Sequence, residues 1–140
     1  MTFRTRRMQR QEITESPRVV VVGHCGAGKS TLVAGLREHG IDAVTSAQEH
    51  SIVSDLWRRR GADLLVYLDI DLDTIRRRRG SHWPESIYRV QEDRLAGARK
   101  AADIVIDTGA RDLTQTIATA EDLVRRWRHH HLNQSGPGVG

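Results

Sequence analysis

The chain has 140 residues, of which 38 % are hydrophobic and 4 % aromatic, and its formal net charge is +4 at pH 7. This length accommodates one domain with an aliphatic core. A single cysteine excludes an internal disulfide framework, and no apolar run has the length of a membrane span, so we expect a cytoplasmic protein. The basic balance favours anionic ligands and does not by itself indicate a nucleic-acid partner.

Residues 1–17 carry several arginines and little hydrophobic periodicity. We predict a flexible basic arm here. A contact of this arm with phosphate or with a partner is the alternative.

The folded part begins with the apolar run 19–22, whose β-branched residues predict a strand buried on both faces. The segment 23–31 follows at once and matches the spacing G-x-x-x-x-G-K-[ST] of a phosphate-binding loop. Its glycines allow successive N–H groups to point inward, and the helix that starts near Lys29 adds its positive end. In such a loop Lys29 contacts the outer phosphates of a nucleotide and the Ser30 hydroxyl binds Mg²⁺. The expected nucleotide-binding residues of the loop are Gly23, Gly26, Ala27, Gly28, Lys29, Ser30 and Thr31.

Three elements are predicted between this loop and residue 61. The first helix ends at Gly40, and residues 41–45 form a short second strand. Over 46–60, apolar residues at positions 52, 53, 56 and 57 have the spacing of a helix that buries one stripe.

The second half of the chain repeats the alternation of strand and helix. Residues 64–69 read as a buried strand, followed by a short helix that Asp71 or Asp73 caps and that contains Arg76–Arg79. A break at 80–84 precedes a longer helix from Pro84 or Glu85 to residue 102, with positions 87, 90 or 91, 94 or 95, and 98 along one side. Residues 103–107 form the last strand, 108–110 a loop, and a final helix begins near residue 112.

This order predicts a three-layer α/β/α fold with a parallel sheet of four to five strands. The folded domain would span residues 18–131, with a disordered tail at 132–140. Ligands of such sheets bind at the carboxyl ends of the strands. The loop 23–31, Asp69, Asp71 and the pair Thr108-Gly109 should therefore meet at one edge.

With these pieces in place, residues 18–128 resemble the P-loop kinases of the adenylate, shikimate and dephospho-coenzyme A kinase group. The strongest similarities are the loop 23–31 and the order of strand, arginine-rich helix, break, helix and strand over 64–107. The resemblance implies an ATP site with Mg²⁺ and phosphoryl transfer to a small molecule. By position it implies lid arginines within 76–79 and an adenine-side loop at Thr108, Gly109 and Ala110. The catalytic residues so expected are Lys29, Arg76, Arg79 and Asp69.

The same arginines can also form a plain solvated helical face, and at most two of four consecutive helical residues can face one ligand. The functional interpretation is favoured because they directly follow a strand end and because arginine neutralises charge on a transferring phosphoryl group.

One strand of the kinase group is missing here, the strand that supplies an acidic residue to the magnesium shell. Asp69 or Asp71 can take that role, with Ser30 and Asp69 as the expected metal ligands. Asp55 is the alternative if residues 51–55 form the missing strand, and a shell without any protein carboxylate is a third possibility.

Gln48, Glu49 and His50 follow the second strand, where this kinase group binds the acceptor. They can polarise or deprotonate a hydroxyl, and His50 has suitable acid–base character. The alternative is that they are polar residues at a helix start.

We expect an ATP-dependent small-molecule kinase. A nucleotide-binding regulatory module with little or no hydrolysis is the alternative, because the sheet is short and little chain is left for a substrate-binding insertion. Nucleic acid is not an expected partner, because no aromatic stacking platform accompanies the arginines. The acceptor and the oligomeric state stay open.

Overall fold

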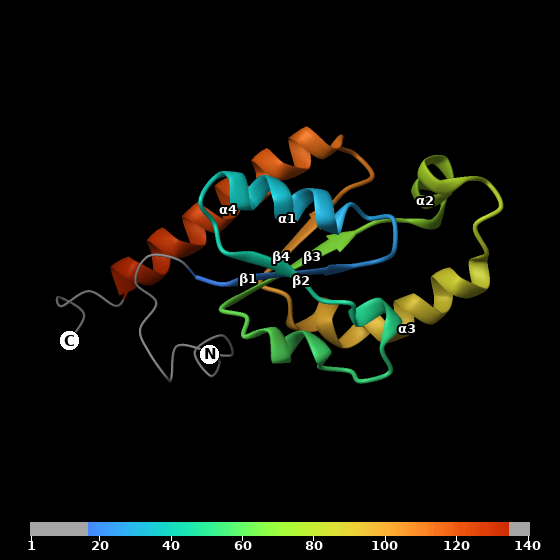
Figure 1. Ribbon diagram of the computed structural model, residues 1–140, viewed down its shortest axis with the longest axis horizontal. Helices are drawn as coiled ribbons and strands as arrows, with labels where there is room; N and C mark the ends of the chain where they lie inside the picture. Colours follow the sequence, from blue (N-terminus) through green and yellow to red (C-terminus); the bar gives the residue numbers. More distant parts are fainter. Residues whose placement is uncertain (1–16, 135–140) are drawn as a thin grey trace.

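A parallel sheet forms the centre of the molecule, which was obtained as a computed structural model that describes residues 17–134 (Figure 1). Within those residues the sheet has four strands in the order β2-β1-β3-β4, all parallel. Their bounds are Val19–Gly23 for β1, Ala43–Thr45 for β2, Leu64–Asp69 for β3 and Ile104–Asp107 for β4. The predicted fold class is confirmed, with four strands rather than five.

Helices cover both faces of this sheet (Figure 1). α1, Lys29–Glu38, and α4, Leu113–Gln134, lie on one face, and α3, Glu85–Ala101, lies on the other. The short helix α2, Leu72–Arg79, stands beyond the carboxyl ends of the strands. None of the helices in the described part of the chain is long and apolar enough to cross a membrane.

The two faces follow the alternation of side chains along each strand. Val19 and Val21 of β1 pack in the cluster under α1 and α4, whereas Val20 and Val22 pack against α3. All four are fully buried. This explains why a continuous apolar run, rather than an alternating one, marks the central strand.

The helix predicted over residues 46–60 is wrong. Two short 3-10 helices occupy this stretch, η3 at Gln48–His50 and η4 at Leu56–Arg60. Trp57 is buried as the pattern predicted, but Ile52 is 87 % exposed. The buried Gln48 side chain explains the difference, since its amide donates to Val53 O (2.6 Å) and accepts from Trp57 N (3.1 Å) and so takes over backbone groups that a continuous helix would pair.

The alternative in which residues 51–55 form a fifth strand is also wrong, because the segment has no strand and Asp55 is the exposed residue before η4. Other boundaries differ slightly: β2 begins at Ala43, and α4 extends to Gln134, inside the segment predicted as a tail. The predictions of a flexible arm and of a disordered tail fall mainly on residues 1–16 and 135–140, outside the described part of the chain.

Candidate functional site

The loop between β1 and α1 has the backbone that its glycines allow. Gly26 and Gly28 both have φ = +94°, a conformation that other residues rarely adopt. Gly28 is the residue before α1, so no side chain caps the first turn of that helix. Ser30 and Thr31 of this turn are exposed, and the uncapped amides give the positive helix end that an anion requires.

Lys29 turns back over the loop and is held by three acceptors. Its Nζ donates to Gly23 O (3.0 Å), to His24 O (3.1 Å) and to the Glu49 carboxylate (2.7 Å). Only 12 % of the Lys29 side chain and 5 % of the Glu49 side chain are exposed. The strongest of these contacts is therefore a nearly buried ion pair, which interacts more strongly than a surface pair.

Glu49 reaches Lys29 because β2 lies directly beside β1. Residues of the two strands pair as far as Val21 and Thr45, and Ser46 N extends the pairing by donating to Val21 O (3.1 Å). η3 begins two residues later, so Glu49 falls at the carboxyl end of the central strand. One oxygen of its carboxylate, Oε1, is buried and has no hydrogen-bond partner. An oxygen that is buried without a partner is costly, so this atom is a candidate contact for a ligand.

Helix α3 holds the outer side of the loop. Gln91 Oε1 accepts from Cys25 N (3.1 Å), and His24 Nε2 lies 2.6 Å from a Glu92 carboxylate oxygen. The buried His24 ring also stacks on Tyr88 with ring centroids 4.4 Å apart. Burial, and next the charge of Glu92, raises the pKa of the Tyr88 hydroxyl. The loop is thus fixed from its side as well as from its ends.

The predicted lid arginines divide into two groups. Arg78 donates to Thr108 O (2.9 Å) and approaches Gly26 O (3.5 Å), and the Arg79 side chain lies against Gly26, 3.1 Å from the point where a Cβ would be. Arg76 instead donates to Trp83 O (3.0 Å), which fixes the break after α2. Arg78 and Arg79 therefore lie at the loop, whereas the observed contact of Arg76 is structural.

The two predicted carboxylates after β3 are already engaged. Asp69 pairs with Arg99 of α3 at 2.8 Å, and this hydrogen bond raises the pKa of the Arg99 guanidinium. Asp71 caps α2 by accepting from Thr74 N (2.7 Å). Hydrogen bonding to the Thr74 side chain, and next to its backbone N–H, lowers the pKa of the Asp71 carboxyl.

The adenine-side loop predicted at residues 108–110 reaches the same edge. Thr108 is buried, and its N–H (2.9 Å) and hydroxyl (3.2 Å) both donate to Asp69 O. Gly109 N donates to Asp107 Oδ1 (2.8 Å), and Gly109 is exposed. Because Arg78 bonds Thr108, the loop 23–31, the end of α2 and the loop after β4 form one continuous rim.

Sequence reasoning missed the ion pair of Lys29 with Glu49 and the two contacts from α3. The signal for Glu49 was its place after the second strand, but its partner depended on strand order. The helical spacing predicted that either residue 90 or residue 91 lies along the side of the helix with positions 87 and 98. Nothing in the neighbouring sequence indicated that the Gln91 amide would bind the loop.

No three His, Cys, Asp or Glu side chains of residues 17–134 gather into a metal site of their own. Mg²⁺ is usually held by one or two protein oxygens together with phosphate oxygens and water. The exposed Ser30 hydroxyl and the partnerless Glu49 Oε1 are oxygens of the kind that Mg²⁺ prefers, and both belong to elements at this edge.

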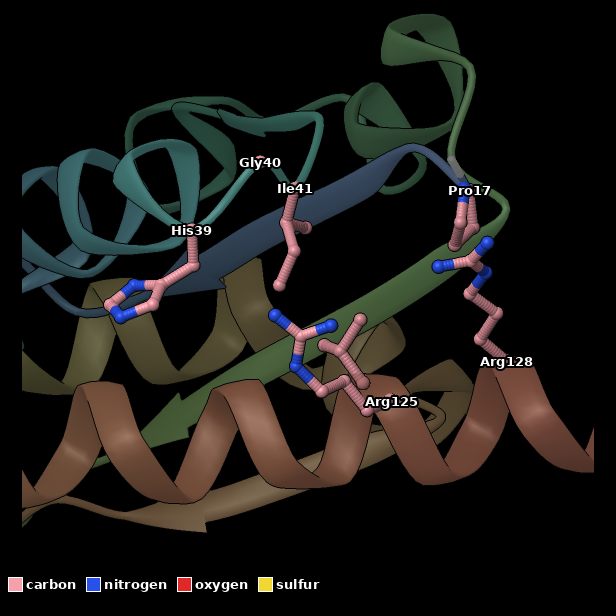
Figure 2. Close-up of a pocket in the computed structure, with 7 residues that line it drawn as sticks. Pro17, His39, Gly40, Ile41, Arg125 and Arg128 are labelled. Atoms are coloured by element: carbon pink, nitrogen blue, oxygen red, sulfur yellow. The ribbon is translucent and has the colours of Figure 1, made fainter. Parts of the chain in front are cut away.

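A cavity of about 200 Å³ lies at the opposite edge of the sheet (Figure 2). His39, Arg125 and Arg128 line it from the end of α1 and from α4, together with residues that precede β1 and β2. It therefore sits at the amino ends of the strands, away from Lys29. Ligands of parallel sheets bind at the other end.

Comparison with solved structures identifies the fold. Shikimate kinase from Bacteroides thetaiotaomicron matches with a TM-score of 0.58 and 15 % sequence identity, over 78 % of this chain and 98 % of the other. No protein-family model matches the sequence, and a search of curated proteins returns no match. The chain thus shares the α/β fold of that shikimate kinase, with a four-stranded parallel sheet.

Proposed function

We propose that this protein binds MgATP on residues 23–31 and transfers the γ-phosphoryl group to a hydroxyl of a small molecule. The observation that carries the proposal is the arrangement of Lys29, whose ammonium stands over a glycine loop at an uncapped helix start, beside a buried carboxylate. The fold shared with a shikimate kinase supports it.

Each residue at the rim has a role in this proposal. Phosphate oxygens compete with Glu49 for Lys29, which then neutralises charge on the transferring group. Arg78 and Arg79 lie over the loop and add to that neutralisation, and Arg76 holds the turn that follows them. Thr108 and Gly109 lie beside the adenine ring of the nucleotide, as the resemblance implies.

The chemical step needs a group that removes a proton. The acceptor oxygen forms a bond to the γ-phosphorus, the bond from that phosphorus to the bridging oxygen of ADP breaks, and the hydroxyl proton passes to a base. Glu49 is the proposed base, because its Oε1 is buried without a partner and is freed further when Lys29 turns to phosphate.

Mg²⁺, when bound with the nucleotide, neutralises phosphate charge. Ser30 is the proposed protein ligand, as the sequence predicts. Asp69 remains the proposed second support through its place at the end of β3, although it would first have to leave Arg99. Glu49 is the alternative second ligand.

The test measures binding and turnover separately. Calorimetry with ATP and with GTP, each with Mg²⁺, should show micromolar binding, and ADP release should rise when a hydroxylated acceptor is added. Absence of binding to any nucleotide contradicts the proposal.

A regulatory nucleotide-binding module is the second candidate function. Lys29 has a complete set of protein acceptors, and the sheet is short for a kinase. Tight nucleotide binding with no turnover across a panel of acceptors would favour this second function.

A further inference from the structure

A second cavity opens on the α3 side of the loop and has a volume of about 380 Å³. Four segments line it: the loop, η3, the turn before α3 and α3 itself. The lining residues are Cys25, His50, Trp83, Ser86, Ile87, Val90, Gln91 and Arg94. Gln91 both lines the cavity and bonds the loop at Cys25 N, so the cavity adjoins the proposed phosphate site directly.

The wall that α3 gives to this cavity is apolar and exposed. Ile87 is 41 % and Val90 46 % exposed, although the residues of α3 that face the sheet, such as Leu95 and Ala98, are fully buried. Ile87, Val90 and Arg94 of α3 are three and four residues apart, a spacing that places them on one face of the helix, and Trp83 lines the cavity from the turn before α3. An apolar face beside a polar loop is typical of a ligand pocket, whose walls are mostly apolar with a few polar groups that orient the ligand.

The polar groups of the cavity are cationic or neutral. Arg94 Nη1 donates to Glu49 O (3.4 Å), which places the guanidinium at η3, and 58 % of the His50 side chain is exposed. No Asp or Glu is among the described lining residues. An anionic group on a ligand therefore meets a fixed positive charge here and no repelling carboxylate from the wall.

We propose that the acceptor of the phosphoryl group is a small amphiphilic anion. Its apolar body, an aromatic ring or a branched alkyl group, packs on Trp83, Ile87 and Val90, and its carboxylate or phosphate binds Arg94. Its hydroxyl points toward the loop, where the transfer described above takes place. The volume suits a molecule of roughly a dozen non-hydrogen atoms, if each needs about as much space as a water molecule in the liquid.

The same wall disfavours polyhydroxylated acceptors. Each hydroxyl set against Ile87 or Val90 would lose contact with water and gain no hydrogen bond, which is unfavourable. This inference rests on the proposed function but makes a separate claim, about the chemistry of the acceptor.

Two probes of the proposed class test the claim, 4-(hydroxymethyl)benzoate and 3-hydroxy-3-methylbutanoate. Benzyl alcohol is the matched probe without an anion, and shikimate is the polyhydroxylated carboxylate. Binding to the whole protein is followed by calorimetry and by intrinsic tryptophan fluorescence, to which Trp83 contributes, with and without Mg²⁺ and a non-hydrolysable ATP analogue. We expect at least one probe of the class to bind about tenfold more tightly than benzyl alcohol and shikimate.

Substitutions at cavity residues test whether the probes bind in this cavity. Val90→Asp should weaken probe binding about tenfold or more, and Arg94→Gln, which keeps a donor for Glu49 O, should remove the preference for the anionic probe over benzyl alcohol. Val105→Asp is the matched control, because Val105 is 47 % exposed on β4 and does not line the cavity. It should leave probe affinity unchanged.

The outcomes separate this claim from the proposed function. Nucleotide binding together with tighter binding of shikimate than of either probe, or with no response to Val90→Asp, overturns the acceptor class and leaves the nucleotide site standing. Probe binding that needs Val90 and Arg94 without any nucleotide binding supports the ligand class and overturns the kinase. A dimer in light scattering that Val90→Asp dissociates would show that a second copy covers this face, and would overturn the inference.

Discussion

At the scale of single residues, the pair of Lys29 and Glu49 determines what the site can do. Lys29 Nζ has acceptors for all three of its protons without a ligand. A nucleotide must therefore exchange phosphate oxygens for protein oxygens at this ammonium. Binding and the release of the Glu49 carboxylate become one event.

Glu49→Gln tests that coupling. The variant removes the competing negative charge at Lys29, so MgATP affinity should stay the same or rise, whereas phosphoryl transfer should fall about 10²-fold because the base is lost. Calorimetry and a coupled assay of ADP release measure the two quantities.

Glu85→Gln is the matched control for this variant, since Glu85 pairs only with Arg89 on the exposed side of α3 among the contacts of the described residues. A Glu49→Gln protein that loses nucleotide affinity and transfer to the same extent would show that Glu49 only supports the loop.

The residues of the site could be predicted where their role is local. The glycine-dependent turn between β1 and α1 follows from the spacing of its glycines. The position before a helix predicted a cap at Asp71 or Asp73, and Asp71 is the residue observed there. Glu49 at Lys29 and Gln91 at Cys25 could not be predicted in this way, because each contact joins residues that are far apart in sequence and depends on which strand neighbours β1.

At the scale of elements, close packing of α1 on α4 positions the start of α1 that carries Lys29. Gly35 makes this approach possible, since a Cβ at this position would lie 2.7 Å from Ile117 Cδ1. α1 keeps its other contacts with α4 and the sheet through Leu32, Val33 and Leu36.

Gly35→Ala should therefore lower the free energy of unfolding by about 1–3 kcal/mol through overpacking. Adding Ile117→Ala removes the three clashing atoms, so the double variant should be more stable than the sum of the two single effects. Urea unfolding followed by circular dichroism measures all three proteins.

Gly97→Ala on α3 is the control for the clash. Its Cβ would meet only Ser54 O at 3.6 Å, an ordinary contact, so this variant should be neutral or slightly more stable because alanine favours a helix. Equal destabilisation by both alanines would contradict the packing argument.

Most elements could be predicted because their patterns are local. β1, β3 and α3 lie where the apolar runs and breakers place them. The prediction of a helix over residues 46–60 was wrong, although the apolar residues there have helical spacing. The side chain of one buried residue, Gln48, forms hydrogen bonds with backbone groups across the segment instead.

At the scale of the whole molecule, the central sheet buries an ionisable group. Tyr67 of β3 is 1 % exposed, and burial, followed by the charges of Glu92 and Asp69, raises the pKa of its hydroxyl above the ordinary value of 10. Below pH 10 both the folded and the unfolded states keep this proton. Above pH 10 the unfolded chain releases it first, so stability falls as pH rises toward the folded-state pKa.

Tyr67→Phe should remove this part of the alkaline loss, about 1.4 kcal/mol for each pH unit between the two pKa values. The free energy of unfolding of both proteins is compared at pH 8 and at pH 11. Parallel losses in wild type and variant would contradict the assignment to Tyr67.

The central claim is that residues 23–31 bind a nucleotide through Lys29, and MgATP affinity with and without Lys29 tests it most directly. Removing the lysine alone would leave the buried Glu49 charge without its Lys29 partner, so Lys29→Ala is introduced into the Glu49→Gln background and compared with Glu49→Gln. The account predicts that the added substitution weakens MgATP binding about 30-fold or more, the equivalent of about 2 kcal/mol for a charged hydrogen bond, with circular dichroism unchanged. Equal affinity of the two proteins for MgATP would contradict it.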